Sequence, residues 1–416
     1  MSGCAHDPSA GFAGLGRKAM AARVPLDGSI ALTHRCNLRC IHCYLGDQSA
    51  IRRHRDQEMS TEEVTGVIDA LVDAGTLNLT ITGGDPMVRR DFPAIYAHAV
   101  RRGLLVTVFC DAVLVTERIV SLFRELPPRM VEVSLYGATA ETYEAITQVP
   151  GSFARCLAGI ERLAASRLRF KLKTVLMRAN RHELDAMRAI ARHYGVGFHF
   201  DTALFPCLPN GDNGGRANAD RARDGRRATV DVAAPTTATR GLDGPLAQRL
   251  DPEEAARAHL SDPEYAAELA AFHARTRALP ASDALYVCGA GLTSFHVDPY
   301  ANLQPCTIST NLRYSLREGS FADGWNGPVA GLRELRAAPD HACTTCDKRG
   351  LCAGCPAVFA AETGAADRRS AYVCRSTHAL HEALTGASAA ADDPAGRAAT
   401  ASATGSVERM PEEALS

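Results

Sequence analysis

Signals for export, membrane insertion and nucleic-acid binding are missing from this 416-residue sequence. No apolar run approaches the roughly 20 residues that a membrane-spanning helix needs. Residues 1–12 lack a basic region followed by an apolar core, so we expect no secretory signal. The formal net charge of −1 gives no overall field that attracts nucleic acid or an anionic membrane, and we expect neither as a partner. Lysine is scarce, with 4 Lys against 42 Arg, which in an alanine-rich chain indicates codon bias rather than an anion-binding surface.

Cysteine, by contrast, is abundant, with 14 in the chain. Without export signals we expect a cytoplasmic location, where clustered cysteines hold metals more often than they form disulfides. The length allows two or three domains and a large core. Cysteine spacing is therefore the most informative feature of the sequence.

A regular alternation of strand-like and helix-like segments begins near Gly28 and ends near Phe205. Six strands alternating with helices predict parallel β/α units, which right-handed crossovers close into a barrel or partial barrel. Ser60 and Glu63 form a capping box at the start of one helix. The expected strands are 29–33, 77–82, 104–109, 130–135, 170–176 and 197–201, and the expected helices are 60–74, 92–102, 116–125, 152–166 and 181–194.

The predicted fold class is α/β, a partial (β/α)6 TIM-like barrel followed by a small cysteine-rich domain that depends on metal for folding. The predicted boundaries are a flexible tail over 1–26, the barrel over 27–206, an insertion loop and linker helix (about 252–277) over 207–285, the cysteine-rich domain over 286–378, and a disordered tail over 387–416.

Three cysteines, Cys36, Cys40 and Cys43, directly follow the first expected strand in a C-x3-C-x2-C pattern. They lie at the carboxyl end of that strand, where α/β barrels place their chemistry. Three thiolates are one fewer than a [4Fe–4S] cluster usually takes, which leaves one iron open. A structural zinc site needs four ligands, and His42, between Cys40 and Cys43, is too cramped to be the fourth.

This triad, together with Gly83-Gly84-Asp85-Pro86 after the second expected strand, resembles the radical SAM superfamily over roughly residues 28–205. The resemblance implies that S-adenosylmethionine (SAM) chelates the open iron through its amino and carboxylate groups. It further implies that an electron from the cluster cleaves SAM to a 5′-deoxyadenosyl radical. The family more often has Glu at the position of Asp85.

The expected SAM-binding residues follow from the same motifs. Gly83 and Gly84 leave the backbone open to close approach by a ligand, and Asp85 supplies an acceptor for its ammonium group. Ser134, in Ser-Leu-Tyr-Gly after the fourth strand, resembles the family's polar contact to SAM, and Tyr44 is expected near the adenine or the cluster. Cys207, after the sixth strand, is a candidate hydrogen donor or substrate contact.

Seven cysteines in the C-terminal region divide as four plus three. The pattern could pass for a zinc ribbon, but it resembles the SPASM domain, which holds two auxiliary [4Fe–4S] clusters. The resemblance implies one cluster on Cys288, Cys306 and Cys355 and another on Cys343, Cys346, Cys352 and Cys374. Relatives often have x3 rather than x2 before the cysteine matching Cys355. The cysteine that many relatives have shortly before Cys288 is missing here, so the first cluster has an open iron or a non-cysteine ligand such as Asp283.

Three functions compete. SPASM proteins mostly act on peptides, so the first is oxidative modification, by crosslinking or dehydrogenation, of a ribosomally made precursor peptide. The second is maturation of sulfatases, but Thr307 stands where those enzymes place a catalytic Asp. The third is a non-catalytic iron–sulfur electron carrier or redox sensor, against which the SAM motifs argue.

The expected partners follow from the first function. A one-electron donor such as flavodoxin or ferredoxin reduces the SAM-cleaving cluster. Only about 27 residues precede the first expected strand, so a separate partner protein is expected to bind any leader segment of the peptide.

Overall fold

The computed structural model describes residues 8–208, 244–277, 282–352 and 354–391. Most of the expected insertion loop and most of the expected C-terminal tail lie outside these residues, as does Cys4. In the described part of the chain, no helix combines the length and apolar character required to cross a membrane.

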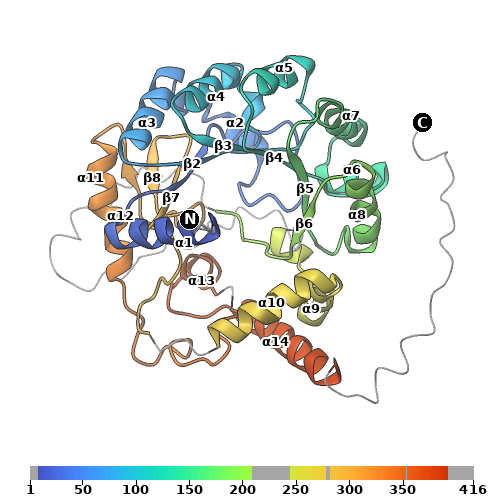
Figure 1. Cartoon of the computed structure of the whole chain (residues 1–416), viewed down its shortest axis with the longest axis vertical. Coiled ribbons are helices and arrows are strands. Elements are labelled where there is room, and N and C mark those ends of the chain that lie inside the picture. Colours follow the sequence, from blue (N-terminus) through green and yellow to red (C-terminus); the bar gives the residue numbers. More distant parts are fainter. Residues whose placement is uncertain (1–7, 209–243, 278–281, 353, 392–416) are drawn as a thin grey trace, which may run out of the picture. The chain divides into compact units, whose positions relative to one another are not determined.

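Six parallel strands form the centre of the molecule in the spatial order β6-β5-β4-β3-β2-β1 (Figure 1). Each expected strand is present within one or two residues of its predicted ends, and the expected partial α/β barrel is confirmed. The strands are β1 (Asp27–Ala31), β2 (Asn78–Thr82), β3 (Leu105–Cys110), β4 (Met130–Ser134), β5 (Phe170–Val175) and β6 (Phe198–Asp201).

Helices cover the outer face of this curved sheet (Figure 1). The capping box at the start of α3 is confirmed, because the Ser60 hydroxyl accepts from the Glu63 amide and the Glu63 carboxylate accepts from the Ser60 amide. Two short helices in loops, α2 and α6, were not predicted. The helices of the barrel are α2 (Gln48–Arg52), α3 (Thr61–Asp73), α4 (Phe92–Arg101), α5 (Glu117–Glu125), α6 (Ala140–Thr147), α7 (Ser152–Ala165) and α8 (Leu184–His193).

The two faces of the sheet differ in chemistry. Residues of the outer face are buried beneath the helices, including Ile81, Val133 and Leu172. The alternate residues share the inner face, as the parallel register shows by pairing Ser29 with Thr80 and Glu132 with Lys171. Those inner residues are mostly polar and only half-buried, so the barrel interior is able to contact a ligand.

Three further strands extend the sheet beyond β1, which the sequence did not predict. They are β7 (Ser294–Val297), β8 (Asn302–Gln304) and β9 (Tyr314–Ser315), and β7 pairs in parallel with β1. Phe295 of β7 packs over Gly28 so closely that a Cβ there would lie 2.4 Å from the ring. The same ring meets Phe321 and Trp325, on α11 (Phe321–Asn326), with centroids 5.1 and 6.1 Å away. Residues 294–315 therefore belong to the barrel sheet rather than to a separate domain.

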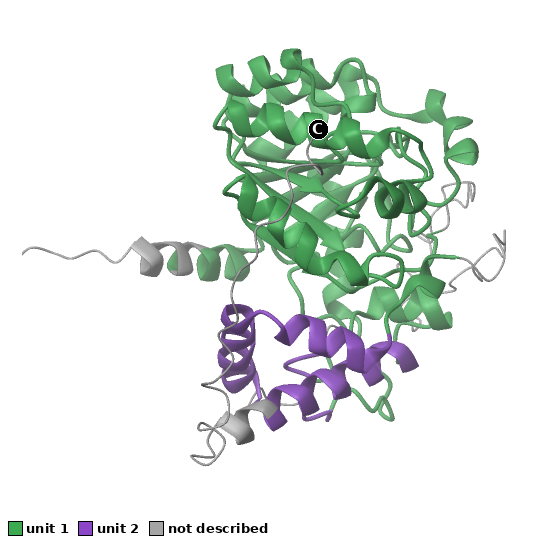
Figure 2. Cartoon of the chain, turned by 90° about the vertical axis from the view of Figure 1, so that its right-hand side faces the viewer, with its two compact units in different colours: residues 1–250, 281–344, 354–370 green, residues 251–280, 345–353, 371–416 purple. Residues whose placement is uncertain are grey.

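The chain divides into two compact units (Figure 2). Unit 1 comprises residues 1–250, 281–344 and 354–370, and includes the sheet, α12 (Pro328–Gly331) and α13 (Pro356–Thr363). Unit 2 comprises residues 251–280, 345–353 and 371–416, with α9 (Pro252–Leu260), α10 (Pro263–Thr276) and α14 (Ala371–Ala391). The expected cysteine-rich domain over 286–378 is thus divided between the units.

The expected linker helix and the expected C-terminal tail differ from the structure in their bounds. The linker helix is two helices, because Asp262 caps a new helix with Pro263 in its first turn. Helix α14 continues to Ala391, past the expected start of the tail at 387.

Residues 8–22 form helix α1 where we expected a flexible tail. The chain is anchored immediately after it, because Arg23 donates to the carbonyl oxygens of Gly291 and Trp325 and lies over the Trp325 ring at 4.5 Å.

The backbone that follows β2 packs directly on the backbone that follows β1. The Gly84 amide donates to the Thr33 carbonyl at 2.8 Å, and the Asp85 amide donates to the Arg35 carbonyl at 3.1 Å. A Cβ on Gly83 would lie 2.1 Å from the Thr33 oxygen, and one on Gly84 would lie 2.4 Å from the Arg35 oxygen. The two glycines are therefore required by contact with the chain itself, and their expected role beside a ligand stays a prediction.

We predict that Gly84→Ala lowers the free energy of unfolding by about 1–3 kcal/mol, because the new methyl group must displace backbone rather than a movable side chain. Gly66→Ala is the matched control. Gly66 lies in α3 with nothing within 4 Å of its Cβ position, so alanine there stabilises the helix by about 0.5–1 kcal/mol. Urea unfolding measures both, and equal midpoints for Gly84→Ala and the wild type would contradict the packing argument.

Candidate functional site

The cysteine triad lies on the loop between β1 and α2. Hydrogen bonds to main-chain groups hold this loop near its start and farther along. Gln48 accepts from the Cys36 amide at 2.8 Å and donates to the His34 carbonyl at 3.2 Å. Farther along the loop, the amides of Arg39 and Ile41 donate to carbonyl groups at the end of α6 at 2.9 and 3.0 Å. These contacts are all within the protein, so they do not depend on a bound cofactor.

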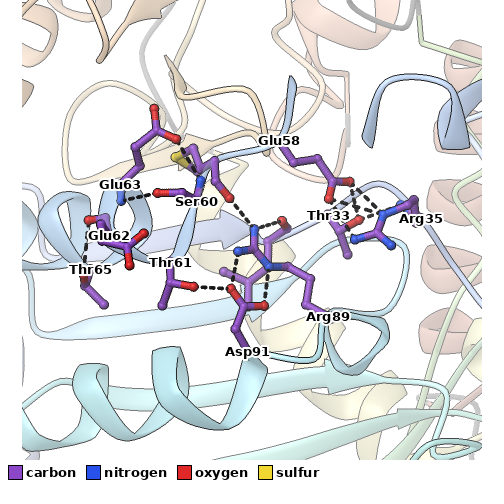
Figure 3. Close-up of polar contacts among 12 residues, drawn as sticks. Thr33, Arg35, Glu58, Ser60, Thr61, Glu62, Glu63, Thr65, Arg89 and Asp91 are labelled. Carbon is purple, nitrogen blue, oxygen red and sulfur yellow. Dashed lines mark hydrogen bonds and ion pairs between the residues drawn. The ribbon is translucent and has the colours of Figure 1, made fainter. Parts of the chain in front are cut away.

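Buried charged side chains brace the segment that leads into the triad (Figure 3). Arg35 pairs with Glu58 at 3.0 Å, and the Thr33 hydroxyl also donates to Glu58. Arg89 donates to the carbonyl groups of Leu32 and Met59 at 3.1 and 2.7 Å and is itself held by Asp91. These residues were not predicted from the sequence, although Arg89 and Asp91 closely follow the Gly-Gly-Asp-Pro motif.

The triad thiols are half-buried and influence one another electrostatically. Burial raises the pKa of Cys36, with Asp111 and Asp85 adding to the effect, and burial with the charge of Cys43 raises the pKa of Cys40. Buried thiols of this kind ionise only beside a positive charge, which an iron–sulfur cluster supplies on binding. The Cys36 sulfur also accepts from the Leu38 amide at 3.3 Å, a contact that favours thiolate. The donor set therefore fits a cluster.

Two buried carboxylates lie beside the triad. Asp85, only 1% exposed, accepts from the amides of Met87 and Asp111 at 2.8 and 3.0 Å. Asp111 accepts from the Asn37 side chain at 2.7 Å, and its oxygen lies 3.9 Å from the Cys36 sulfur. Burial raises the pKa of both carboxylates, and the charge of Asp85 further raises the pKa of Asp111. This concentration of negative charge fits a cationic ligand, and SAM carries both a sulfonium and an ammonium group.

Asp111 and Asn37 were not identified from the sequence. Asp111 follows the end of β3, so its place at the carboxyl edge of the sheet was the available signal.

The other expected SAM contacts lie close to the triad. Tyr136 hydrogen-bonds with Ser134, and burial together with the charges of Cys40, Cys36 and Cys43 raises the pKa of Tyr136. Burial and then Cys43 raise the pKa of Tyr44 to about 12. Ser134 and Tyr44 therefore lie near the triad, as expected of SAM contacts.

Cys207 and His42 also lie at the triad. The exposed Cys207 has its sulfur 3.8 Å from the Cys43 carbonyl oxygen. The His42 ring packs edge-on against Tyr136 with centroids 4.6 Å apart, and burial lowers its pKa to about 4. Within the described ranges, no three His, Cys, Asp or Glu side chains converge on one metal-ion position.

A pocket opens at the carboxyl ends of β1, β2 and β7. It includes residues next to the triad, such as His34 and Tyr44, and Thr307, which follows Cys306 in the chain. The lining residues are Ala31, His34, Tyr44, Leu45, Thr82, Gly83, Leu208, His296, Asp298, Tyr300, Gln304, Thr307, Thr310 and Arg313. Burial lowers the pKa of His34 to about 4 and of His296 to about 3, so both rings are neutral near pH 7.

On the inner face of β4 and β5, two of the four lysines of the chain share one carboxylate. Glu132 pairs with Lys171 at 2.9 Å and with Lys173 at 3.2 Å. The Lys173 ammonium also lies 2.9 Å from the centroid of Phe109, and burial lowers its pKa to about 8. This part of the barrel interior has more positive than negative groups.

Three of the C-terminal cysteines, Cys288, Cys306 and Cys355, gather in unit 1 around Tyr286. Burial followed by the charges of the three thiols raises the pKa of the Tyr286 phenol. Burial raises the pKa of Cys306 to about 11, although backbone amides of Ser309 and Ile308 donate to its sulfur.

Cys355 precedes α13 and accepts from two amides of its first turn. Such amides stabilise thiolates that ligate a cluster. Asp283, considered as a further ligand, instead pairs with Arg336 at 3.6 Å and is largely exposed.

The other four cysteines are divided between the units. Cys343 belongs to unit 1, whereas Cys346, Cys352 and Cys374 belong to unit 2. Within unit 2, the Thr377 hydroxyl donates to the Cys352 sulfur at 3.3 Å. Thr377 lies three residues after Cys374 on α14, so Cys352 lies beside the helix segment that carries Cys374.

Comparison with known proteins agrees with this geometry. Residues 30–190 match the model of the radical SAM superfamily. The chain is 26% identical over 335 residues to an AdoMet-dependent heme synthase of Methanosarcina barkeri, which covers 80% of this chain and 91% of that protein. It is 27% identical to the mycofactocin maturase MftC of Mycolicibacterium smegmatis, over 78% of this chain and 76% of that one.

Two solved structures share the fold. Streptococcus suis SuiB bound to its precursor peptide SuiA has a TM-score of 0.61 at 15% identity, covering 90% of this chain and 82% of that one. The enzyme anSMEcpe with bound AdoMet has a TM-score of 0.61 at 14% identity, covering 87% and 98%. Residues 30–190 therefore resemble the radical SAM superfamily, and the curated relatives and the two solved structures agree with that resemblance.

Proposed function

We propose that this protein reductively cleaves SAM and uses the resulting radical to modify a peptide oxidatively, by crosslinking or dehydrogenation, with a ribosomally made precursor as substrate. The observation that carries the proposal is the fixed loop that presents three half-buried thiols beside the buried Asp85 and Asp111. Bound there, a [4Fe–4S] cluster supplies the electron that cleaves SAM to a 5′-deoxyadenosyl radical.

In this proposal the residues of the chain have separate tasks. Cys36, Cys40 and Cys43 ligate the cluster. Asp85, with its orientation fixed by two backbone amides, faces the ammonium of SAM, and Ser134 and Tyr44 contact other parts of the molecule. Gly83 and Gly84 position Asp85 through their contact with residues 33–35.

A peptide substrate is supported by relatives of two kinds. One curated relative is a mycofactocin maturase, and among the proteins of similar fold SuiB was solved with a precursor peptide and anSMEcpe with a Cys-containing peptide. The pocket between the triad and Cys306 offers both polar and aromatic side chains to such a substrate.

The auxiliary clusters complete the proposal. Cys288, Cys306 and Cys355 hold one cluster, and Cys343, Cys346, Cys352 and Cys374 hold the other. There they would accept the electron released when the substrate radical left by hydrogen abstraction is oxidised. A flavodoxin or ferredoxin supplies the first electron, a separate protein binds any leader segment, and the reaction takes place in the reducing cytoplasm.

A second candidate function is suggested by the heme synthase and by an Fe-coproporphyrin III synthase of the same organism, which is 28% identical over 156 residues. The substrate is then a porphyrin carboxylate rather than a peptide. Stimulation of SAM cleavage by Fe-coproporphyrin III, and not by peptides, distinguishes this candidate.

We predict that the anaerobically reconstituted chain forms 5′-deoxyadenosine from SAM under dithionite, and that Cys36→Ala abolishes this activity because the cluster loses a ligand. Cys156→Ala is the matched control, since Cys156 is fully buried in α7 and is not part of the triad. Absence of 5′-deoxyadenosine from an iron-loaded wild-type chain supports the electron-carrier alternative instead.

We assign Cys207 a catalytic role as hydrogen donor or substrate contact, supported by its exposure and its closeness to Cys43. In D2O its thiol carries deuterium, so turnover without substrate transfers deuterium to 5′-deoxyadenosine, as mass spectrometry detects. Cys207→Ala lowers that incorporation, whereas Cys110→Ala, which removes a buried thiol, leaves it unchanged. If Cys207→Ala and the wild type incorporate equal amounts of deuterium, the catalytic role of Cys207 is contradicted.

Reconstitution is predicted to load about twelve irons per chain, four for each of three clusters. Cys355→Ser lowers the count to about eight while SAM cleavage persists, because the triad loop does not include this residue. Cys207→Ala serves as the control with an unchanged count. Elemental analysis gives the result, and four irons, or stoichiometric zinc, in the wild type rules out three clusters.

A further inference from the structure

The pocket described above contains one guanidinium group without a carboxylate partner. Arg313 donates through Nε to the Thr310 carbonyl, which leaves its two terminal nitrogens without a described partner. In the part of the chain that the structure describes, no carboxylate oxygen lies within salt-bridge distance of it. Such a pair of nitrogens is the fork that binds a carboxylate with two parallel hydrogen bonds.

Asp298, the acidic side chain in the same pocket, is hydrogen-bonded to other groups of the protein. Its oxygens accept from the amides of Tyr300 and Asn302, both at 2.9 Å, and from the side chains of Asn302 and Gln304 at 2.8 and 3.2 Å. These contacts shape the turn between β7 and β8. Asp298 is therefore a structural carboxylate; burial raises its pKa, and the nearby charge of Arg313 acts in the opposite direction.

The neighbours of Arg313 in the pocket suit an anion. Thr307 and Thr310 offer hydroxyl groups, and no described hydrogen bond uses either of them. His34 lies close enough to feel the charge of Arg313, and its buried Nδ1 has no hydrogen-bond partner in the described structure. A pocket with a guanidinium, two hydroxyls and an unpaired ring nitrogen is built for a ligand with several acceptor atoms.

We propose that Arg313 determines substrate choice by binding a carboxylate of the substrate peptide in this pocket. The inference rests on the proposed peptide-modifying function. Because the pocket also includes Tyr44, next to Cys43, and Thr307, next to Cys306, a carboxylate held by Arg313 places the adjoining part of the peptide between the triad loop and Cys306.

The test uses the reconstituted full chain with SAM and three pools of random heptapeptides. One pool has free C-termini and no Asp or Glu, one has amidated C-termini with Asp and Glu, and one is amidated without them. Retention after equilibrium ultrafiltration is measured by mass spectrometry. We expect the wild type to retain one carboxylate-bearing pool about 10- to 100-fold better than the fully amidated pool. Which pool is retained identifies the C-terminus or an acidic side chain as the source.

Arg313→Gln is expected to lose this preference, and Arg313→Lys to keep part of it, because lysine retains the charge but not the fork. Arg336→Gln removes an arginine that is half-exposed and paired with Asp283 outside the pocket, and it is expected to keep the preference. SAM cleavage without peptide is expected to be unchanged in Arg313→Gln, which also shows that the variant folds.

The inference is overturned if the wild type retains all three pools equally, or if Arg313→Gln keeps the preference of the wild type. It is also overturned if Arg313→Gln loses SAM cleavage in the absence of peptide, because that result assigns Arg313 to the carboxylate of SAM. If the wild type does not cleave SAM, the proposed function is contradicted. Peptide retention then still tests whether Arg313 binds a carboxylate.

Discussion

The site depends on the contact between two pieces of backbone, residues 83–85 after β2 and residues 33–35 after β1. Two short hydrogen bonds and two glycines without room for a Cβ hold these pieces together. One piece leads into the cysteine loop and the other carries Asp85, so a single contact sets the position of both the cluster ligands and the carboxylate beside them. Glu58 and Arg89 then brace the same segment from its outer side.

Charge is the second constraint. The triad, Asp85 and Asp111 place several groups of potential negative charge in one buried region, and burial disfavours ionisation of each. A positively charged occupant relieves that cost for all of them together. In the pocket the balance is reversed, because among the described residues no carboxylate pairs with Arg313. The interior therefore separates a region that attracts cations from one that attracts anions.

Much of the barrel could be predicted because its signals are local. Strand patterns, the Ser60 capping box and the cysteine spacing all lie within short stretches of sequence. The missed features come from contacts between distant stretches. Strand β7 joins β1 through the packing of Phe295 over Gly28, and Asp111 reaches Cys36 across 75 residues. The division of the C-terminal cysteines between two units likewise has no local signal, since Cys343 and Cys346 are only three residues apart.

The pairing of β7 with β1 has a consequence for electron transfer. These neighbouring strands of one hydrogen-bonded sheet lead to the triad loop on one side and to the hairpin before Cys306 on the other. Groups bound at the two places are therefore separated by a length that the sheet itself sets. Tunnelling rates fall steeply with distance, so a separation fixed by the sheet also fixes the rate of electron transfer between groups bound at the two places.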